Sequence, residues 1–181
     1  MRKPARDIQC EPVRSVVPAE RRHLGIPDFL EVFDLWDKMR GERPAPSWPE
    51  IDLINLPLTR LPYCVVVDVS SDPQDFVYRF WGSRITDLHQ HDLTGKSVRQ
   101  INPQDVGETL FLQYARSAQA RTPALFVNHV TSGYGLLTEE VILRLPLSSD
   151  NIRIDHFICI FDFNLNARVY EKFLDQIDAN N

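Results

Sequence analysis

Apolar and polar positions alternate with a period of two in five segments of the chain, a pattern typical of β-strands. These segments span residues 62–70, 76–81, 124–130, 139–147 and 154–163. In the fourth segment the apolar positions Val141, Leu143 and Leu145 should point inward, which places Arg144 on an outward, solvated face. Short linkers of turn-type residues join the first two segments and the last three, so we predict antiparallel hairpins.

Apolar residues recur at helical spacing in three further segments, 28–40, 108–121 and 167–178. Shorter helices are expected at 83–89 and within 98–107. The helix over 28–40 carries an aromatic stripe that must pack on something, either its own domain or a second copy of the chain. Both alternatives stay open here, and the candidate interface residues are Phe29, Phe33 and Trp36.

The order of these elements predicts an α+β fold, with a five-stranded antiparallel sheet, helices on one face, and flanking helices at both ends. We expect a flexible N-terminal arm at 1–24, because three prolines and scattered charges there show no periodicity. A flanking helix and a proline-rich connector follow at 25–50, then the main domain at 51–163 and a C-terminal helix at 164–181.

Composition narrows the possible partners. The formal net charge of -5 argues against nonspecific binding to nucleic acid or to anionic membranes, because both need a basic surface. No apolar run is long enough to span a bilayer and no secretory signal begins the chain, so we expect a cytoplasmic protein. Cys10, Cys64 and Cys159 are widely spaced and include no CxxC pair, which indicates neither a disulfide framework nor a structural metal site.

Two strands, several short helices, one longer helix and three strands follow one another in an order that resembles a PAS domain. Several motifs carry this resemblance to short, stand-alone bacterial PAS-like proteins over about residues 30–163. They are Trp36 with Arg40-Gly41, Pro46, Ile51-Asp52, Tyr78-Arg79-Phe80 with Gly82, and Asp92-Leu93-Thr94-Gly95-Lys96. The resemblance implies a non-enzymatic sensory or protein-interaction module with a pocket between sheet and helices. It would bind a small ligand or a partner, form a homodimer, and signal in trans to an effector protein.

The candidate pocket residues come from the elements that should face each other across such a pocket. They are Phe80, Leu88, Phe111, Tyr114, Asn128, His129 and Phe161. Asn128 and His129 are adjacent on an otherwise apolar strand, so one of them should face inward. A buried polar group there needs a neighbouring side chain, a water or a ligand as its partner.

The sequence lacks, at the corresponding positions, the residues with which PAS domains bind a flavin covalently or ligate haem. Segment 85–91 lacks the cysteine that would bond covalently to a flavin, and the helix at 108–121 lacks a histidine to bind haem. Flavin and haem are therefore disfavoured, and the ligand stays unidentified. His89, His91 and the nearby aspartates are better explained by a solvated helix end than by a metal site.

Two alternatives to the sensory module stay open. One is a small α+β enzyme of the isomerase or dehydratase type, in which His129 would act with Asp162 or Asp68 as acid and base. No GxSxG, HExxH or GxGxxG motif accompanies these residues, so we expect no enzyme activity. The other alternative is a structural adaptor with a filled core.

Overall fold

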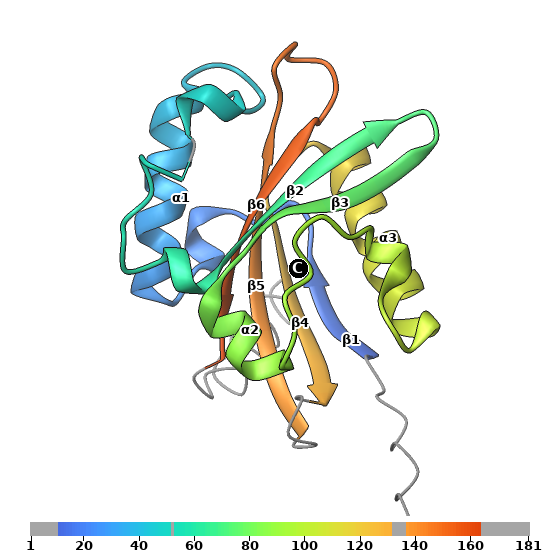
Figure 1. Ribbon diagram of the computed structural model, residues 1–181. Coiled ribbons are helices and arrows are strands. Elements are labelled where there is room, and N and C mark those ends of the chain that lie inside the picture. The colour runs from blue at the N-terminus through green and yellow to red at the C-terminus, as the bar shows by residue number, and fades with distance from the viewer. Residues whose placement is uncertain (1–10, 52, 132–136, 164–181) are drawn as a thin grey trace, which may run out of the picture.

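The computed structural model describes residues 11–51, 53–131 and 137–163 of the chain. Within them, a six-stranded antiparallel sheet runs in the order β1-β4-β5-β6-β2-β3, with helices on both of its faces (Figure 1). Its strands are β1 (Glu11–Val16), β2 (Cys64–Ser71), β3 (Gln74–Trp81), β4 (Ala124–Thr131), β5 (Leu137–Leu147) and β6 (His156–Asp162). The five strands expected from the alternating pattern are all present. The helix expected at 164–181 lies outside the described residues.

Helices cover the sheet from two sides. On one face lies α1 (Pro27–Arg40), and on the other lie α2 (Ser83–His89) and α3 (Gln104–Ala120) (Figure 1). Short 3-10 helices connect them: η1 (Arg21–His23), η2 (Trp48–Glu50), η3 (Leu61–Tyr63) and η4 (Val98–Gln100). The long helix thus begins four residues earlier than its apolar pattern indicated. Pro103 has an extended backbone (ψ 157°) and precedes its first turn, so the helix starts directly after the proline.

The sixth strand, β1, falls within the segment that we expected to be a flexible arm. Its residues pair with β4, from Glu11 opposite His129 to Val16 opposite Leu125. The expectation for 1–24 therefore does not hold for residues 11–16. The segment mixes apolar and charged residues without alternation and contains Pro12, so its own sequence shows no strand pattern, and the pairing depends on the open edge that β4 provides.

The aromatic stripe of α1 is buried against its own sheet. Of the two alternatives, packing on its own domain or on a second copy of the chain, the structure shows the first. Phe29, Phe33 and Trp36 lie in one apolar core with Leu143 and Leu145 of β5. The indole Nε1 of Trp36 donates a hydrogen bond to the carbonyl oxygen of Pro146 at 2.8 Å. These three residues, expected at an interface, are core residues in this structure, and α1 covers a sheet face that we had expected to lack a helix.

The proline-rich connector after α1 is anchored by hydrogen bonds. The Glu50 carboxylate accepts two bonds from the Arg43 guanidinium, at 2.9 and 2.8 Å, and two more from the backbone and hydroxyl of Ser47, at 2.8 and 2.7 Å. The bonds from Arg43, followed by those from Ser47, lower the pKa of Glu50 to about 2. Pro46 then accepts a bond from the backbone N–H of Ser148 at 2.9 Å, which holds the connector at the end of β5.

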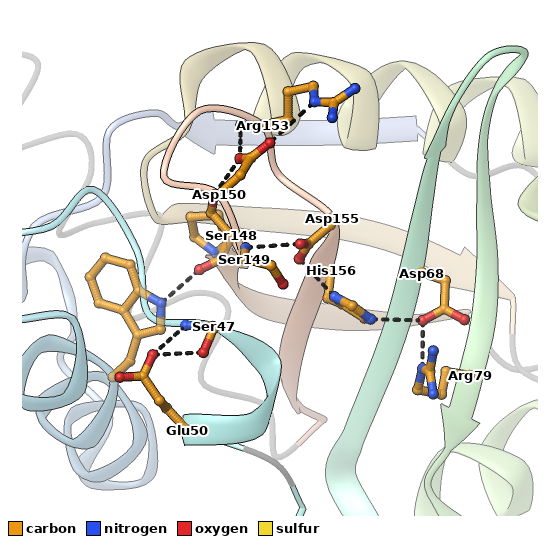
Figure 2. A network of polar contacts seen from close by, with 12 residues as sticks. Ser47, Glu50, Asp68, Arg79, Ser148, Ser149, Asp150, Arg153, Asp155 and His156 are labelled. Atoms are coloured by element: carbon orange, nitrogen blue, oxygen red, sulfur yellow. Dashed lines mark hydrogen bonds and ion pairs between the residues drawn. The ribbon is translucent and has the colours of Figure 1, made fainter.

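A chain of polar contacts joins β6, β2 and β3 through His156, Asp68 and Arg79 (Figure 2), and a ring contact links it to the connector. The Trp48 ring stacks on the His156 ring with a centroid distance of 5.6 Å. His156 lies between two carboxylates, with Nδ1 2.7 Å from Asp155 and Nε2 3.5 Å from Asp68. Arg79 pairs with the same Asp68 at 2.6 Å and is exposed, as the alternation indicated. The connector, β6, β2 and β3 are therefore joined by side chains as well as by the sheet.

Gly82 separates β3 from α2 because the backbone is crowded there. A Cβ on Gly82 would overlap the carbonyl group of Pro62, and the Gly82 N–H donates to the Cys64 carbonyl oxygen at 2.9 Å. The loop after α2 then returns to β3, where Gly95 (φ 78°) donates to the Tyr78 carbonyl at 2.7 Å. Both glycines of the motif identified in the sequence thus fix how α2 and its following loop lie over the sheet.

Candidate functional site

A partly enclosed cavity of about 100 Å³ lies between the sheet and the helices α2 and α3. Its wall is mainly apolar and is formed by residues of strands β3, β4, β5 and β6, helices α2 and α3, and the loops on either side of η4. Its apolar lining includes Trp81, Leu93, Ile101, Val106, Leu110 and Ile142. Exposed His91 and Asn102 also line it.

Strand β5 brings two charged residues into this cavity. Side chains alternate along a strand, so Glu140, Ile142 and Arg144 face α3 whereas Val141 and Leu143 face α1. Because helices cover both faces, both sets are buried, and Arg144 is only 1% exposed. This corrects the expectation that Arg144 faces solvent.

The Arg144 guanidinium is held between aromatic rings. Its Cζ lies 3.6 Å from the centroid of the Tyr114 ring and 4.5 Å from that of Phe126. Nη1 donates a long hydrogen bond of 3.5 Å to the Ser117 hydroxyl, whereas Nε has no hydrogen-bond partner among the described residues. No carboxylate in the described part of the chain forms an ion pair with this guanidinium.

Two more nitrogen donors of cavity-lining residues lack partners. The Asn128 oxygen Oδ1 accepts a bond from Gln113 Nε2 at 2.9 Å, which leaves Asn128 Nδ2 unpaired among the described residues. The indole Nε1 of Trp81 is likewise buried with no hydrogen-bond partner in this part of the chain. A buried donor without an acceptor costs about 1–3 kcal/mol, so three such groups on residues that line one cavity favour acceptor atoms there. Two oxygens beside them also lack a well-aligned hydrogen bond among the described residues: Gln113 Oε1, and Glu140 Oε1, whose contact is an ion pair with His89.

A buried ion pair lies at the α2 end of the cavity. His89 Nε2 is 2.7 Å from Glu140 Oε1, and the Glu140 side chain is only 5% exposed. Burial opposes protonation of His89, but the hydrogen bond and negative charge of Glu140 outweigh it and raise the pKa of His89 above its ordinary value. This pair joins α2 directly to β5.

The hydroxyl and thiol groups beside Arg144 stay protonated. Tyr114 Oη lies 3.7 Å from Cys159 Sγ, and both side chains are buried. Burial raises the pKa of Tyr78, Tyr114 and Cys159. A thiol with a raised pKa is a poor nucleophile, so Cys159 packs as a small apolar group.

The structure brings three of the seven expected pocket residues to the cavity: Tyr114, Asn128 and Phe161. Phe111 packs nearby on Phe76, with ring centroids 5.2 Å apart, and Leu88 is half-buried on α2 without belonging to the lining. Phe80 packs on the opposite side of the sheet, with the core under α1.

His129 faces away from its neighbour Asn128. Its Nε2 lies 3.0 Å from Glu139. Asp68, one of the two carboxylates considered as its acid–base partner, instead pairs with Arg79 and His156. Asp162 lines a separate hollow with Arg60 and Tyr63. Of the polar pair Asn128-His129, it is therefore Asn128 that faces inward, as the strand pattern required of one of them.

The sequence argument did not select most of the residues that line the cavity, among them Trp81, His89, Glu140 and Arg144, all of which carry polar groups. The aromatic stripe of α1 could have indicated that these residues are buried. Had the stripe been assigned to the second face of the sheet, both faces of the strand at 139–147 would have been covered. Glu140 and Arg144 would then have been recognised as buried charges that need partners.

The antiparallel sheet, the helices on it and the cavity between them place the chain in a class of α+β domains that have a small internal site. The chain matches the family model described as "PAS domain" over residues 26–161, and it therefore belongs to the PAS-domain family. Sensing or interaction is the general role of this family. Among the residues of His, Cys, Asp and Glu that the structure describes, no group of three or more is arranged to hold a metal ion.

The chain was also compared with solved structures and with curated proteins. A solved structure entitled "Structure of an RNA-binding Light-Oxygen-Voltage Receptor" is 12% identical to the chain, with a TM-score of 0.44. The similarity covers 97% of this chain but only 44% of that one, so the chain spans less than half the length of that receptor. No curated protein matches the sequence. No helix in the described residues is long and apolar enough to cross a membrane.

Proposed function

We propose that the chain is a sensory PAS module that binds a small molecule in the cavity between the sheet and α3. The observation that carries this proposal is the set of buried N–H donors around the cavity, from Arg144, Asn128 and Trp81, which lack acceptors among the described residues. Binding sites for small molecules are typically apolar concavities with a few placed polar groups, and this cavity has that composition. The cavity also argues against an adaptor with a filled core.

Native mass spectrometry of the purified chain tests the proposal. We expect a mass adduct that disappears on denaturation. Substitution Val106→Phe would place a larger side chain in the cavity wall and should abolish the adduct, whereas Leu112→Phe, on the exposed side of the same helix, should retain it. Ligand binding in the cavity is ruled out if the adduct is equally abundant in both variants, or if no adduct and no ligand-induced thermal shift is found.

The output is proposed to pass in trans, to a second copy of the chain or to an effector protein. Membership in the PAS-domain family supports this part of the proposal, because the family comprises sensory and interaction modules. Since Phe29, Phe33 and Trp36 are buried, dimer contacts would use other surfaces. Light scattering with and without ligand tests the homodimer, and a monomer under both conditions would leave the effector protein as the proposed partner.

A further inference from the structure

We propose that the cavity ligand is a small monocarboxylate with an apolar body about the size of one aromatic ring and a hydrogen-bond acceptor at its far end. This inference rests on the proposed function, because it names the chemical class of the molecule in the same cavity. It is carried by the buried, unpaired Arg144 and by the size of the space beside it.

The charge of Arg144 requires the anion. Burying an ionised group is costly unless it is paired, and no carboxylate of the described residues pairs with this guanidinium. The rings of Tyr114 and Phe126 lie against it and offset part of the cost. Its Nε–H belongs to the edge that carboxylates engage with two parallel hydrogen bonds, and Nε has no hydrogen-bond partner among the described residues.

A single negative charge fits the balance of charges around the cavity. The negative charge of Glu140 is engaged by His89 at 2.7 Å, and the raised pKa of His89 favours its protonated form. That pair is neutral as a whole, which leaves the one positive charge of Arg144. A monocarboxylate would neutralise it, whereas a doubly charged phosphate would leave a buried excess of negative charge.

The volume limits the body of the ligand. A cavity of about 100 Å³ is smaller than the engineered cavity of about 150 Å³ that binds benzene in another protein, so the body can be no larger than a single ring, and this partly enclosed site must widen to admit a ring with substituents. Ile142 lies between Glu140 and Arg144 on the same face of β5 and gives the middle of the site an apolar floor.

The far end of the site offers neutral donors. Asn128 lies opposite Glu140 in the sheet, two residues along β4 from Phe126, which lies opposite Ile142. Its unpaired Nδ2 can donate to a hydroxyl or carbonyl oxygen on the ligand, and the unpaired Trp81 Nε1 is a second donor of the same lining. A ring bearing a carboxylate at one end and an oxygen at the other, as in 4-hydroxybenzoate, has this arrangement.

Isothermal titration calorimetry with four probes tests the inference: benzoate, 4-hydroxybenzoate, and the neutral, isosteric benzamide and 4-hydroxybenzamide. With the wild-type chain, we expect each carboxylate to bind at least tenfold more tightly than its amide, and 4-hydroxybenzoate more tightly than benzoate. Arg144→Met should remove the preference for the carboxylate. Arg153→Met, which removes an exposed arginine, should leave it unchanged.

The comparison of probes on the wild-type chain remains valid even if Arg144→Met does not fold. In that case Arg144→Lys replaces it as the variant, because lysine keeps the positive charge but lacks the planar guanidinium edge. Equal affinity for carboxylates and amides would overturn the inference but leave a ligand-binding cavity intact. Binding of carboxylates that survives Val106→Phe would also overturn it, because the anion would then bind elsewhere. If no probe binds and native mass spectrometry shows no adduct, the proposed function itself fails.

Discussion

Trp36 and Arg144 are both fully buried, yet their polar groups have different surroundings. The indole N–H of Trp36 has a backbone acceptor at 2.8 Å, so the side chain is satisfied within the fold. Arg144 Nε has no acceptor in the described part of the chain, although its guanidinium is covered by two rings. Side chains of the first kind stabilise the domain, and those of the second kind mark where a further molecule completes the contacts.

The Trp36→Ala variant should lower the free energy of unfolding by about 3–5 kcal/mol, the range typical of a large buried aromatic. Trp36→Phe retains most of the packing but leaves the Pro146 carbonyl without its donor, which should cost about 1–3 kcal/mol. Urea denaturation followed by circular dichroism measures both. Exposed Leu112→Ala is the control, with a change expected within about 0.5 kcal/mol. Destabilisation no larger than that of the control would contradict the core position of Trp36.

The His89–Glu140 pair should make stability depend on pH. The pKa of His89 is raised in the folded chain, so its contribution is fully present below the unfolded pKa of about 6.5 and is lost as pH rises through the raised value. The difference in unfolding free energy between wild type and His89→Gln should therefore be largest near pH 6 and shrink toward pH 9.

Urea denaturation at a series of pH values measures this difference. Burial lowers the pKa of His23, which gives an opposite slope, but this effect is common to both chains and cancels. His91→Gln, at an exposed neighbouring position, is the control and should follow the wild type. A difference between wild type and His89→Gln that stays constant with pH would show that the pair is not charged in the folded state.

At the scale of elements, a strand could be predicted where its own sequence shows a strand pattern. This was so for five strands and not for β1. Strands β2 to β6 carry apolar and β-branched residues bounded by turn-type residues, so local sequence was sufficient to locate them. Strand β1 shows no alternating pattern and is defined by pairing with β4, a contact more than 100 residues away in the chain. For the same reason the burial of Arg144 escaped the sequence argument, because it depends on which face α1 covers rather than on β5 itself.

Removal of β1 should expose the edge of β4. A chain that begins at Val17 lacks the whole strand, and the unpaired backbone groups of β4 would then be open to pairing with another molecule. We expect a lower thermal midpoint and an increase in light scattering on heating. A chain that begins at Glu11 retains β1 and is the matched control. Equal stability of the two chains would mean that β1 contributes only locally to the edge.

At the scale of the whole molecule, β5 connects two separate layers. Its side chains at 141, 143, 145 and 147 pack under α1, while those at 140, 142 and 144 face the cavity. Tightly packed interiors transmit small shifts, so a ligand that repositions Arg144 or Ile142 would also shift the opposite face of the same strand. Stacking of Trp48 on His156 ties the connector after α1 to β6, and ion pairs from His156 through Asp68 to Arg79 continue to β2 and β3 (Figure 2).

This arrangement predicts a response in α1 to occupancy of a cavity on the other side of the sheet. Hydrogen exchange with and without saturating 4-hydroxybenzoate should show slower exchange in α3 and β5, where the ligand makes contact, and a smaller change in α1. Arg144→Met should weaken both changes together, because the variant no longer favours the carboxylate. Slower exchange confined to α2 and α3 would instead assign the output to the helices that border the cavity, with the His89–Glu140 pair as their direct link to the sheet.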